Sequence, residues 1–144
     1  MKDEALSLKL FLVLSKATQS MMKRVEEDIK GRGLNPTEFA VLELLYHKGD
    51  QPIQKIGGKI LLASSSITYV VDKLEKKDFL VRKSCPKDRR VTYASLTESG
   101  HDLIKDIFPE HKKMIHQLLS GIEDKEKEKM IVNLKHLGYH AEGL

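Results

Sequence analysis

The sequence lacks most of the features that stabilise small extracellular domains or anchor a chain in a membrane. Its 144 residues include one cysteine and no tryptophan, so neither an internal disulfide nor a cysteine-based zinc cluster can form within one chain. Only 4 prolines are present, and no apolar run reaches the ~18 residues that a membrane helix requires. A chain of this length buries enough surface to fold as one domain without a disulfide or a metal.

The first residues do not resemble a secretory signal peptide. The apolar segment from Leu10 to Leu14 is short, and Asp3 and Glu4 occupy the place where such a peptide carries basic residues. Together with the near absence of cysteine, this pattern predicts a cytoplasmic protein with no membrane association.

Positive charge is concentrated in the middle third of the chain. The whole sequence has 25 Lys and Arg against 21 Asp and Glu, for a formal net charge of +4. Residues 48–95 hold 11 of the basic and only 5 of the acidic side chains, whereas the flanking segments together are slightly acidic. A basic segment between nearly neutral flanks favours a module that binds a polyanion such as nucleic acid. A solvated basic face with no partner is the alternative that composition leaves open.

Periodicity divides the chain into helices and one pair of strands. Apolar residues recur at helical spacing in most of the chain, and Asn35 followed by Pro36 and Glu38 is typical of a helix start. The pattern changes to short β-type runs only around a polar connection at residues 85–90. The predicted helices are 5–31, 35–47, 53–60, 64–77, 97–119 and 124–137, and the predicted strands are 80–84 and 91–96.

This order of elements is that of a winged helix-turn-helix, a mainly α fold with a small β-hairpin wing. The helix predicted over 64–77 has an apolar stripe that should face the core, made by Ile67, Val70, Val71 and Leu74. Its other face begins with Ser, Thr and Tyr side chains, which can approach base edges and phosphates in a major groove. A serine run that merely caps the helix is the alternative.

The chain also carries a specific combination of short motifs. They lie at residues 34–42, 66–75, 80–82, 88–90 and 96–100, and they include an Asp-Arg-Arg run followed by Leu-Thr-Glu-Ser-Gly. Together they resemble the MarR family of bacterial transcription regulators, over nearly the whole chain. Within that family, the motifs are most similar to the MhqR-like branch, which represses quinone and catechol detoxification genes.

The resemblance implies an interface for double-stranded DNA. In such proteins a helix enters the major groove, and a wing arginine enters the minor groove, where its guanidinium meets concentrated negative potential. That arginine is Arg90 here, with Asp88 to orient it and Arg89 beside it for a phosphate. For any one lysine, a solvated surface charge is the alternative. Major-groove contacts would come from Ser64, Ser65, Ser66, Thr68 and Tyr69, and phosphate contacts from Lys73, Lys83 and Lys87.

The family also implies a homodimer formed by the N- and C-terminal helices. Residues 1–33 and 98–144 would then be dimerisation helices, and 34–97 the DNA-binding lobe of a single MarR-type domain. Apolar stripes on the last two predicted helices exceed what a thin DNA-binding core needs. A two-fold dimer presents two reading heads about 34 Å apart, which fits a palindromic operator.

Effectors in this family usually bind between the dimer helices and the DNA-binding lobe. Phe39 and Glu43 lie one turn apart on the predicted second helix, and Phe11 and His111 lie on the helices expected to meet it. Two aromatic rings with a carboxylate and an imidazole suit a flat quinone- or catechol-like ring bearing hydroxyl or carbonyl groups. In the alternative interpretation, both phenylalanines belong to the core and Glu43 pairs with His111 at the surface.

Two other switches, thiol chemistry and metal binding, have less support. Cys85 is expected at the base of the wing, where a thiolate could be alkylated by quinones, so a redox or electrophile sensor is an alternative function. Peroxide-sensing relatives keep their reactive cysteine at the start of the first helix, a pattern from which Cys85 departs. His136 and His140 have a spacing suited to a metal but no clustered third ligand, so neither a metal site nor a cofactor is predicted.

The sequence does not predict an enzyme. The Gly57-Gly58-Lys59 run lacks the earlier glycine and the following Ser or Thr of a phosphate-binding loop. A winged helix used for protein contacts is the stronger rival, because a fold does not determine a function. The Asp-Arg-Arg wing has no evident purpose against another protein, so the sequence favours a DNA-binding regulator. Repression is preferred because the family mostly acts by occluding promoters.

Overall fold

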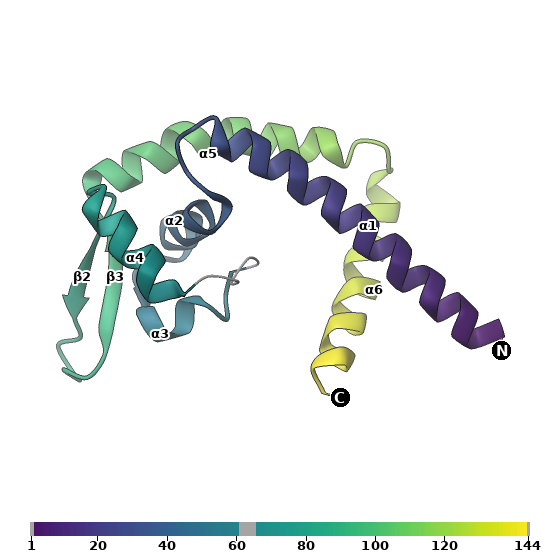
Figure 1. Cartoon of the computed structure of the whole chain (residues 1–144), viewed down its shortest axis with the longest axis horizontal. Coiled ribbons are helices and arrows are strands. Elements are labelled where there is room, and N and C mark those ends of the chain that lie inside the picture. The colour runs from purple at the N-terminus through teal and green to yellow at the C-terminus, as the bar shows by residue number, and fades with distance from the viewer. Residues whose placement is uncertain (1, 61–65, 144) are drawn as a thin grey trace. The chain divides into compact units, whose positions relative to one another are not determined.

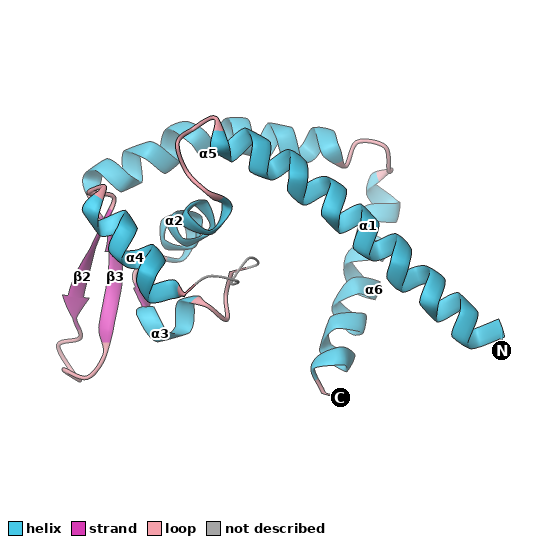
Figure 2. Cartoon of the chain, in the orientation of Figure 1, coloured by secondary structure: helices cyan, strands magenta, loops and turns pink. Residues whose placement is uncertain are grey.

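The computed structural model describes residues 2–60 and 66–143. Within this part of the chain, helices predominate and a small sheet is the only β-structure (Figure 2). The predicted fold class, a mainly α winged helix, is confirmed. The helices are α1 (Lys2–Lys30), α2 (Pro36–Lys48), α3 (Ile53–Ile56), α4 (Ile67–Lys76), α5 (Glu98–Leu118) and α6 (Asp124–Glu142), and the strands are β1 (Gln51–Pro52), β2 (Leu80–Ser84) and β3 (Thr92–Leu96).

Contacts divide the chain into two compact units, one up to His111 and the other from Lys112 onward. Figure 1 shows the order of the elements, with α5 continuing from the first unit into the second. The first unit contains the helix-turn-helix, the sheet and the hydrophobic core, whereas α6 of the second unit has no buried residue. Among the described residues, no helix is long and apolar enough to cross a membrane.

Local sequence signals set the ends of the first two helices. After α1, Gly33 has a φ of 79°, a left-handed conformation that glycine adopts without strain. Asn35 caps α2: its side chain accepts a hydrogen bond from the Glu38 amide at 2.8 Å, and Glu38 accepts one from the Asn35 amide at 3.0 Å. Pro36 fills the first helical position, where no amide donor is needed. The predicted capping box is confirmed.

One hydrophobic core joins the helices and the sheet of the first unit. Leu42 of α2 and Val71 and Leu74 of α4 are fully buried. Because each such side chain contributes about 1.5–3 kcal/mol when buried, this packing decides which face of α4 stays exposed. The buried apolar residues are Ile29, Leu34, Phe39, Val41, Leu42, Leu45, Ile56, Val70, Val71, Leu74, Leu80, Ala94, Ile104 and Ile107.

The sheet has three strands in the order β1-β3-β2, and both pairs are antiparallel. The predicted hairpin of β2 and β3 is present, with Arg82 opposite Ala94. The prediction of only two strands is wrong, because Gln51 and Pro52 pair with β3 as an edge strand. A strand of only two residues, one of them a proline, is too short to show the alternating apolar pattern of a strand. The sequence around Gln51 and Pro52 therefore looks like a turn.

The largest differences between the predicted and the observed helices are in α3, α4 and α6. α3 ends at Ile56 rather than at residue 60, because a turn begins at Gly57. The described part of α4 starts at Ile67, and residues 61–65, which include the predicted start, lie outside the described residues. α6 continues through Gly138 to Glu142, because one glycine inside a helix costs only about 1 kcal/mol.

A tight junction joins the turn before β2 to the start of α5. Thr97 caps α5, since its hydroxyl accepts a hydrogen bond from the Gly100 amide at 2.9 Å and donates one to the Asp78 carbonyl at 2.7 Å. A Cβ at Gly100 would lie only 2.0 Å from the carbonyl oxygen of Phe79. The Leu-Thr-Glu-Ser-Gly motif therefore has a structural purpose, because it fixes the base of the wing to α5.

We expect Gly100→Ala to destabilise the protein by about 1–3 kcal/mol, the usual cost of forcing atoms into a packed region. The obstacle is a backbone carbonyl, which cannot move aside as a flexible side chain can. Urea unfolding followed by circular dichroism measures the effect. Gly121→Ala is the matched control, because nothing lies within 4 Å of a Cβ built there. An equally stable Gly100→Ala variant would contradict the close approach.

Candidate nucleic-acid interface

α4 buries one face and exposes the other, as the helical wheel predicts. The exposed face begins with Thr68 and Tyr69, and Nζ of Lys73 lies 6.0 Å from the centre of the Tyr69 ring. Burial of the apolar stripe therefore presents a hydroxyl, a phenol and an ammonium on one surface. The residues of the buried or half-buried face are Ile67, Val70, Val71 and Leu74.

The serine run before α4 is described only at Ser66. Ser64 and Ser65, both predicted DNA contacts, lie outside the described residues. Ser66 is exposed and occupies the N-cap position, yet its side chain makes no capping hydrogen bond. The simpler interpretation, in which the run serves only to cap the helix, is not supported at Ser66.

The wing ends in an arginine held by an aspartate. The Arg90 side chain is 91% exposed, and its Nε lies 3.2 Å from Oδ1 of Asp88. The Arg90 amide donates to the same oxygen at 3.0 Å, and Nη2 donates to Oδ2 at 3.4 Å. The side-chain hydrogen bonds from Arg90, and then its backbone hydrogen bond, lower the pKa of the Asp88 carboxyl. Asp88 thus has the geometry needed to orient Arg90.

The remaining predicted wing residues lie on the same hairpin. Lys83 on β2 and Lys87 and Arg89 in the following loop are exposed. Cys85 is half-buried at the base of the loop, where its amide donates to the Val91 carbonyl at 3.0 Å. β2 packs beside α4 (Figure 1), so the two predicted parts of the interface are neighbours.

Arg82 links these two parts, and sequence reasoning does not identify it. Its guanidinium forms ion pairs with Asp72 and Glu75 of α4, with an Nη1–Oε1 distance of 2.6 Å to Glu75. A basic residue in a short strand looks like any surface charge, and only the packing of β2 on α4 brings it to these acids. The one signal in the sequence is the pair of acids three residues apart on a helix face that otherwise suits DNA.

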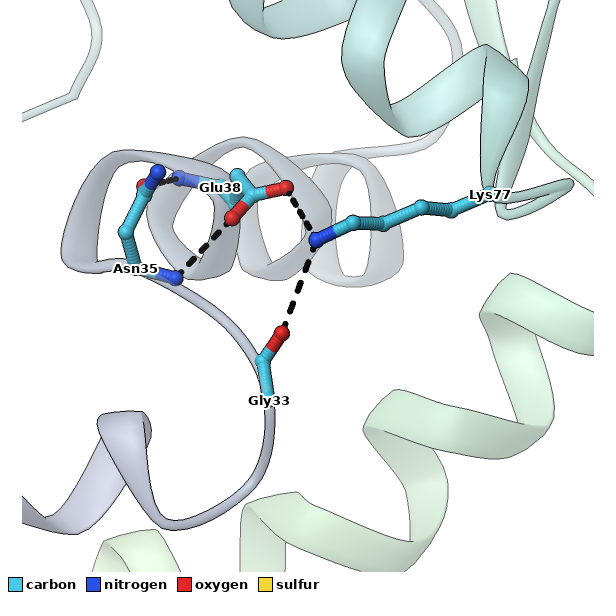
Figure 3. A network of polar contacts seen from close by, with 4 residues as sticks. All are labelled: Gly33, Asn35, Glu38 and Lys77. Carbon is cyan, nitrogen blue, oxygen red and sulfur yellow. Dashed lines mark hydrogen bonds and ion pairs between the residues drawn. The ribbon is translucent and has the colours of Figure 1, made fainter.

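A buried carboxylate fixes the far end of α4. Glu38 is only 2% exposed, and its Oε2 lies 2.8 Å from Nζ of Lys77, the residue that ends α4. Lys77 also donates to the Gly33 carbonyl at 3.5 Å, and the other Glu38 oxygen accepts from the Asn35 amide (Figure 3). One carboxylate thus joins the turn after α1, the start of α2 and the end of α4.

The four residues predicted to bind an effector are only partly brought together. Phe39 and His111 are 3% and 9% exposed, and their ring centroids are 4.6 Å apart. The buried Nδ1 of His111 has no hydrogen-bond partner within the described chain. Glu43 is half-buried, whereas Phe11 on α1 is 64% exposed. The alternative interpretation holds for Phe39, which belongs to the core, but not for Phe11, which is exposed in the single chain, or for His111, which is buried.

Comparison with known proteins agrees with this architecture. Residues 34–92 match the model of the MarR family. Over 135 residues the chain is 58% identical to the HTH-type transcriptional regulator MhqR of Bacillus subtilis (strain 168), across 94% of this chain and 93% of that protein. The chain belongs to the MarR family. The resemblance inferred from its motifs, including the similarity to MhqR, is confirmed.

Solved MarR-type structures share the fold. AbsC, a MarR family transcriptional regulator from Streptomyces coelicolor, superposes with a TM-score of 0.83 over 95% of both chains, at 17% identity. Sco3205 from the same organism, solved in complex with DNA, has a TM-score of 0.76 at 19% identity and covers 100% of this chain and 89% of its own. As a member of a family of transcriptional regulators, the protein is a regulator and not an enzyme.

Lys77→Met should lower the free energy of unfolding by about 1–3 kcal/mol, because it leaves a buried carboxylate without its cation. A fully buried pair would lose more, but the Lys77 side chain is 34% exposed. Urea unfolding measures the change. The control is Lys76→Met, an exposed neighbour on α4, which should shift stability by less than about 0.5 kcal/mol. Equal stability of the two variants would show that Glu38 does not depend on Lys77.

Proposed function

We propose that this MarR-family protein is a repressor that binds a palindromic DNA operator as a homodimer and leaves it when a quinone- or catechol-like compound binds. The DNA-binding part of this proposal rests on one observation. The exposed polar face of α4 lies beside a wing whose tip presents Arg90, held by Asp88. Both belong to the segment 48–95, which holds the positive charge of the chain.

The arrangement suits a two-groove contact. A major groove about 12 Å wide admits an α-helix, and a narrow minor groove attracts a guanidinium. We assign the major groove to α4 and the minor groove to Arg90. The DNA complex of Sco3205, a regulator that shares the fold, supports DNA binding by this kind of protein. The base-facing residues are Ser64, Ser65, Ser66, Thr68 and Tyr69, and the phosphate-facing residues are Lys73, Lys83, Lys87 and Arg89.

Exposed apolar side chains support the homodimer. In the N-terminal half of α1, large apolar residues at least 50% exposed recur from Leu6 to Val13. Clustered apolar side chains exposed in this way mark an interaction surface, and a second copy of the chain can cover it. We therefore assign 1–33 and 98–144 to dimerisation and 34–97 to the DNA-binding lobe. The exposed residues are Leu6, Leu8, Leu10, Phe11, Leu12 and Val13 on α1, and Met130, Ile131, Val132, Leu134, Leu137 and Tyr139 on α6.

A two-fold dimer explains why the operator should be palindromic. Identical lobes related by a two-fold axis read identical half-sites, about 34 Å apart for adjacent major grooves. A protein that covers both half-sites near a promoter blocks access to it, so repression is the simplest outcome. An effector then acts by changing the spacing of the two lobes.

The contact between Phe39 and His111 supports an aromatic effector. The unpartnered Nδ1 of His111 can exchange a hydrogen bond with a hydroxyl or carbonyl group, and the Phe39 ring lies beside it, with ring centroids 4.6 Å apart. Glu43 on the same helix as Phe39 adds a carboxylate, and Phe11 adds a ring from α1. The alternative functions are electrophile sensing through Cys85 and a protein-interaction module without specific DNA binding.

Arg90→Ala should weaken operator binding by about 1–3 kcal/mol, the loss of one well-placed groove contact, while the fold stays intact. The measurement is fluorescence anisotropy of a labelled duplex from the upstream region of the protein's own gene, with a scrambled duplex as reference. In the matched control Arg89→Ala, loss of a phosphate contact should weaken binding to both duplexes alike and reduce the salt slope by about 1.

Two outcomes would contradict this assignment. Unchanged operator binding by Arg90→Ala would remove the wing from the mechanism. A wild-type protein that prefers neither duplex would favour the protein-interaction module instead.

Catechol or benzoquinone should release the wild-type protein from the operator, and Cys85→Ser should respond in the same way. His111→Phe keeps a ring beside Phe39 but removes Nδ1, so it should bind the operator normally and need roughly three- to tenfold more effector, as expected for one lost hydrogen bond. The same anisotropy titration measures both. A Cys85→Ser protein that stays on DNA in benzoquinone would make thiol chemistry the switch, and an unchanged His111→Phe response would exclude His111 from effector binding.

The protein should sediment with about twice the 16.4 kDa mass of one chain. Leu10→Glu places a carboxylate among the apolar residues of α1 and should raise the dimer dissociation constant on the order of tenfold or more. Lys9→Glu, which exchanges one exposed charge for another, is the control. Sedimentation of the wild type as a monomer at micromolar concentration would contradict the homodimer.

A further inference from the structure

Two acidic side chains lie on the face of α4 that the proposed function turns toward DNA. Asp72 follows Thr68 and Tyr69 by one helical turn, and Glu75 follows Asp72 by nearly one more. Their side chains are 51% and 40% exposed. Unpaired carboxylates at this position would repel phosphates, because fixed charges of like sign raise the free energy of approach.

Arg82 compensates both acids at once. From β2, its Nη2 donates to Oδ1 of Asp72 and its Nη1 donates to Oε1 of Glu75 at 2.6 Å. Its backbone amide also points to the second Glu75 oxygen, at 3.4 Å. The hydrogen bond to Asp72, the largest cause, and the nearby charges of both acids raise the pKa of Arg82 above its ordinary value. A planar guanidinium can serve two carboxylates in this way, whereas an ammonium presents a single point charge.

We propose that Arg82 is a positioning residue for DNA binding, which acts by neutralising Asp72 and Glu75 on α4. This inference rests on the proposed DNA-binding function. Arg82 pairs with Ala94 in the middle of the β2–β3 ladder, and the same hairpin carries Arg90 at its tip. The two acids therefore lie beside both elements assigned to DNA, where an uncompensated negative charge would oppose binding.

If the ion pairs of Arg82 served only to stabilise the fold, its loss would lower stability and removal of the two acids would not restore DNA binding. Exposed ion pairs contribute little to folding stability, so the loss of Arg82 should hardly change unfolding. Its effect on DNA binding comes from the two carboxylates that it leaves uncompensated. Removing those carboxylates as well should therefore restore binding, which neither a loss of stability nor a direct contact of Arg82 with a phosphate would allow.

The experiment compares three variants of the full-length protein by anisotropy on the operator duplex, after wild-type binding has been established. Arg82→Met keeps the apolar stem and should bind about tenfold more weakly at about 0.1 M salt. The triple variant Arg82→Met, Asp72→Asn, Glu75→Gln should return to within about threefold of the wild type. Lys48→Met, an exposed basic residue at the end of α2 with no assigned DNA or dimer contact, is the control and should bind like the wild type.

Salt dependence gives a second readout. The ratio of the Arg82→Met and wild-type dissociation constants should shrink as salt rises to about 0.5 M, because repulsion between exposed charges is screened. Asp72→Asn with Glu75→Gln in a chain that keeps Arg82 should bind at least as tightly as the wild type, and this variant tests the proposal even if Arg82→Met does not fold.

Several results would overturn the proposal. A triple variant that stays as weak as Arg82→Met would assign Arg82 to direct phosphate contact, and wild-type affinity of Arg82→Met would remove it from DNA binding. Weaker binding by the Asp72→Asn, Glu75→Gln variant would show that the acids assist binding. Failure of the wild type to bind any duplex would overturn the DNA-binding function itself, and this outcome is seen before any variant is compared.

Discussion

One buried carboxylate joins the start of α2 to the end of α4. Glu38 satisfies the start of α2 through the Asn35 capping box and, with its second oxygen, holds Lys77 at the end of α4. A charge that is 2% exposed must be hydrogen-bonded on most sides, so its partners have little freedom to move. The apolar stripe of α4 decides which face is buried, and the Glu38 pair ties the end of the helix to the start of α2. Together they determine which side chains the molecule offers to a partner.

At the exposed surface, acidic side chains organise the basic ones. Asp88 holds Arg90 at the tip of the wing, and Asp72 and Glu75 hold Arg82 in the middle of β2. A guanidinium on a long side chain has many rotamers, and an adjacent carboxylate reduces them before any ligand arrives. The basic character of the segment 48–95 is therefore a set of oriented donors as well as a net charge.

The core helices and the outer helices differ in how they bury apolar residues. All buried residues of the core lie between Ile29 and Ile107, whereas α6 has none and the first half of α1 exposes most of its leucines. Exposed apolar surface of this kind marks an interaction site in a folded protein. The hydrophobic core is formed within one chain, and the outer helices expose the apolar surface that the proposed homodimer would cover. Phe39 lies on α2 and His111 on α5, and their rings are in contact. This contact joins the helix-turn-helix to α5, the helix that leads to α6.

Features that depend on neighbouring residues could be predicted from the sequence. Helix periods, the Asn35 cap, the buried face of α4 and the two-residue link from Asp88 to Arg90 all follow from local geometry. Only the tertiary structure decided the rest. The edge strand β1 exists because β3 offers it hydrogen bonds, and Arg82 reaches Asp72 and Glu75 because β2 packs on α4. The physical reason is that such contacts join residues far apart in the chain, so they depend on strand register and packing, which no local pattern encodes.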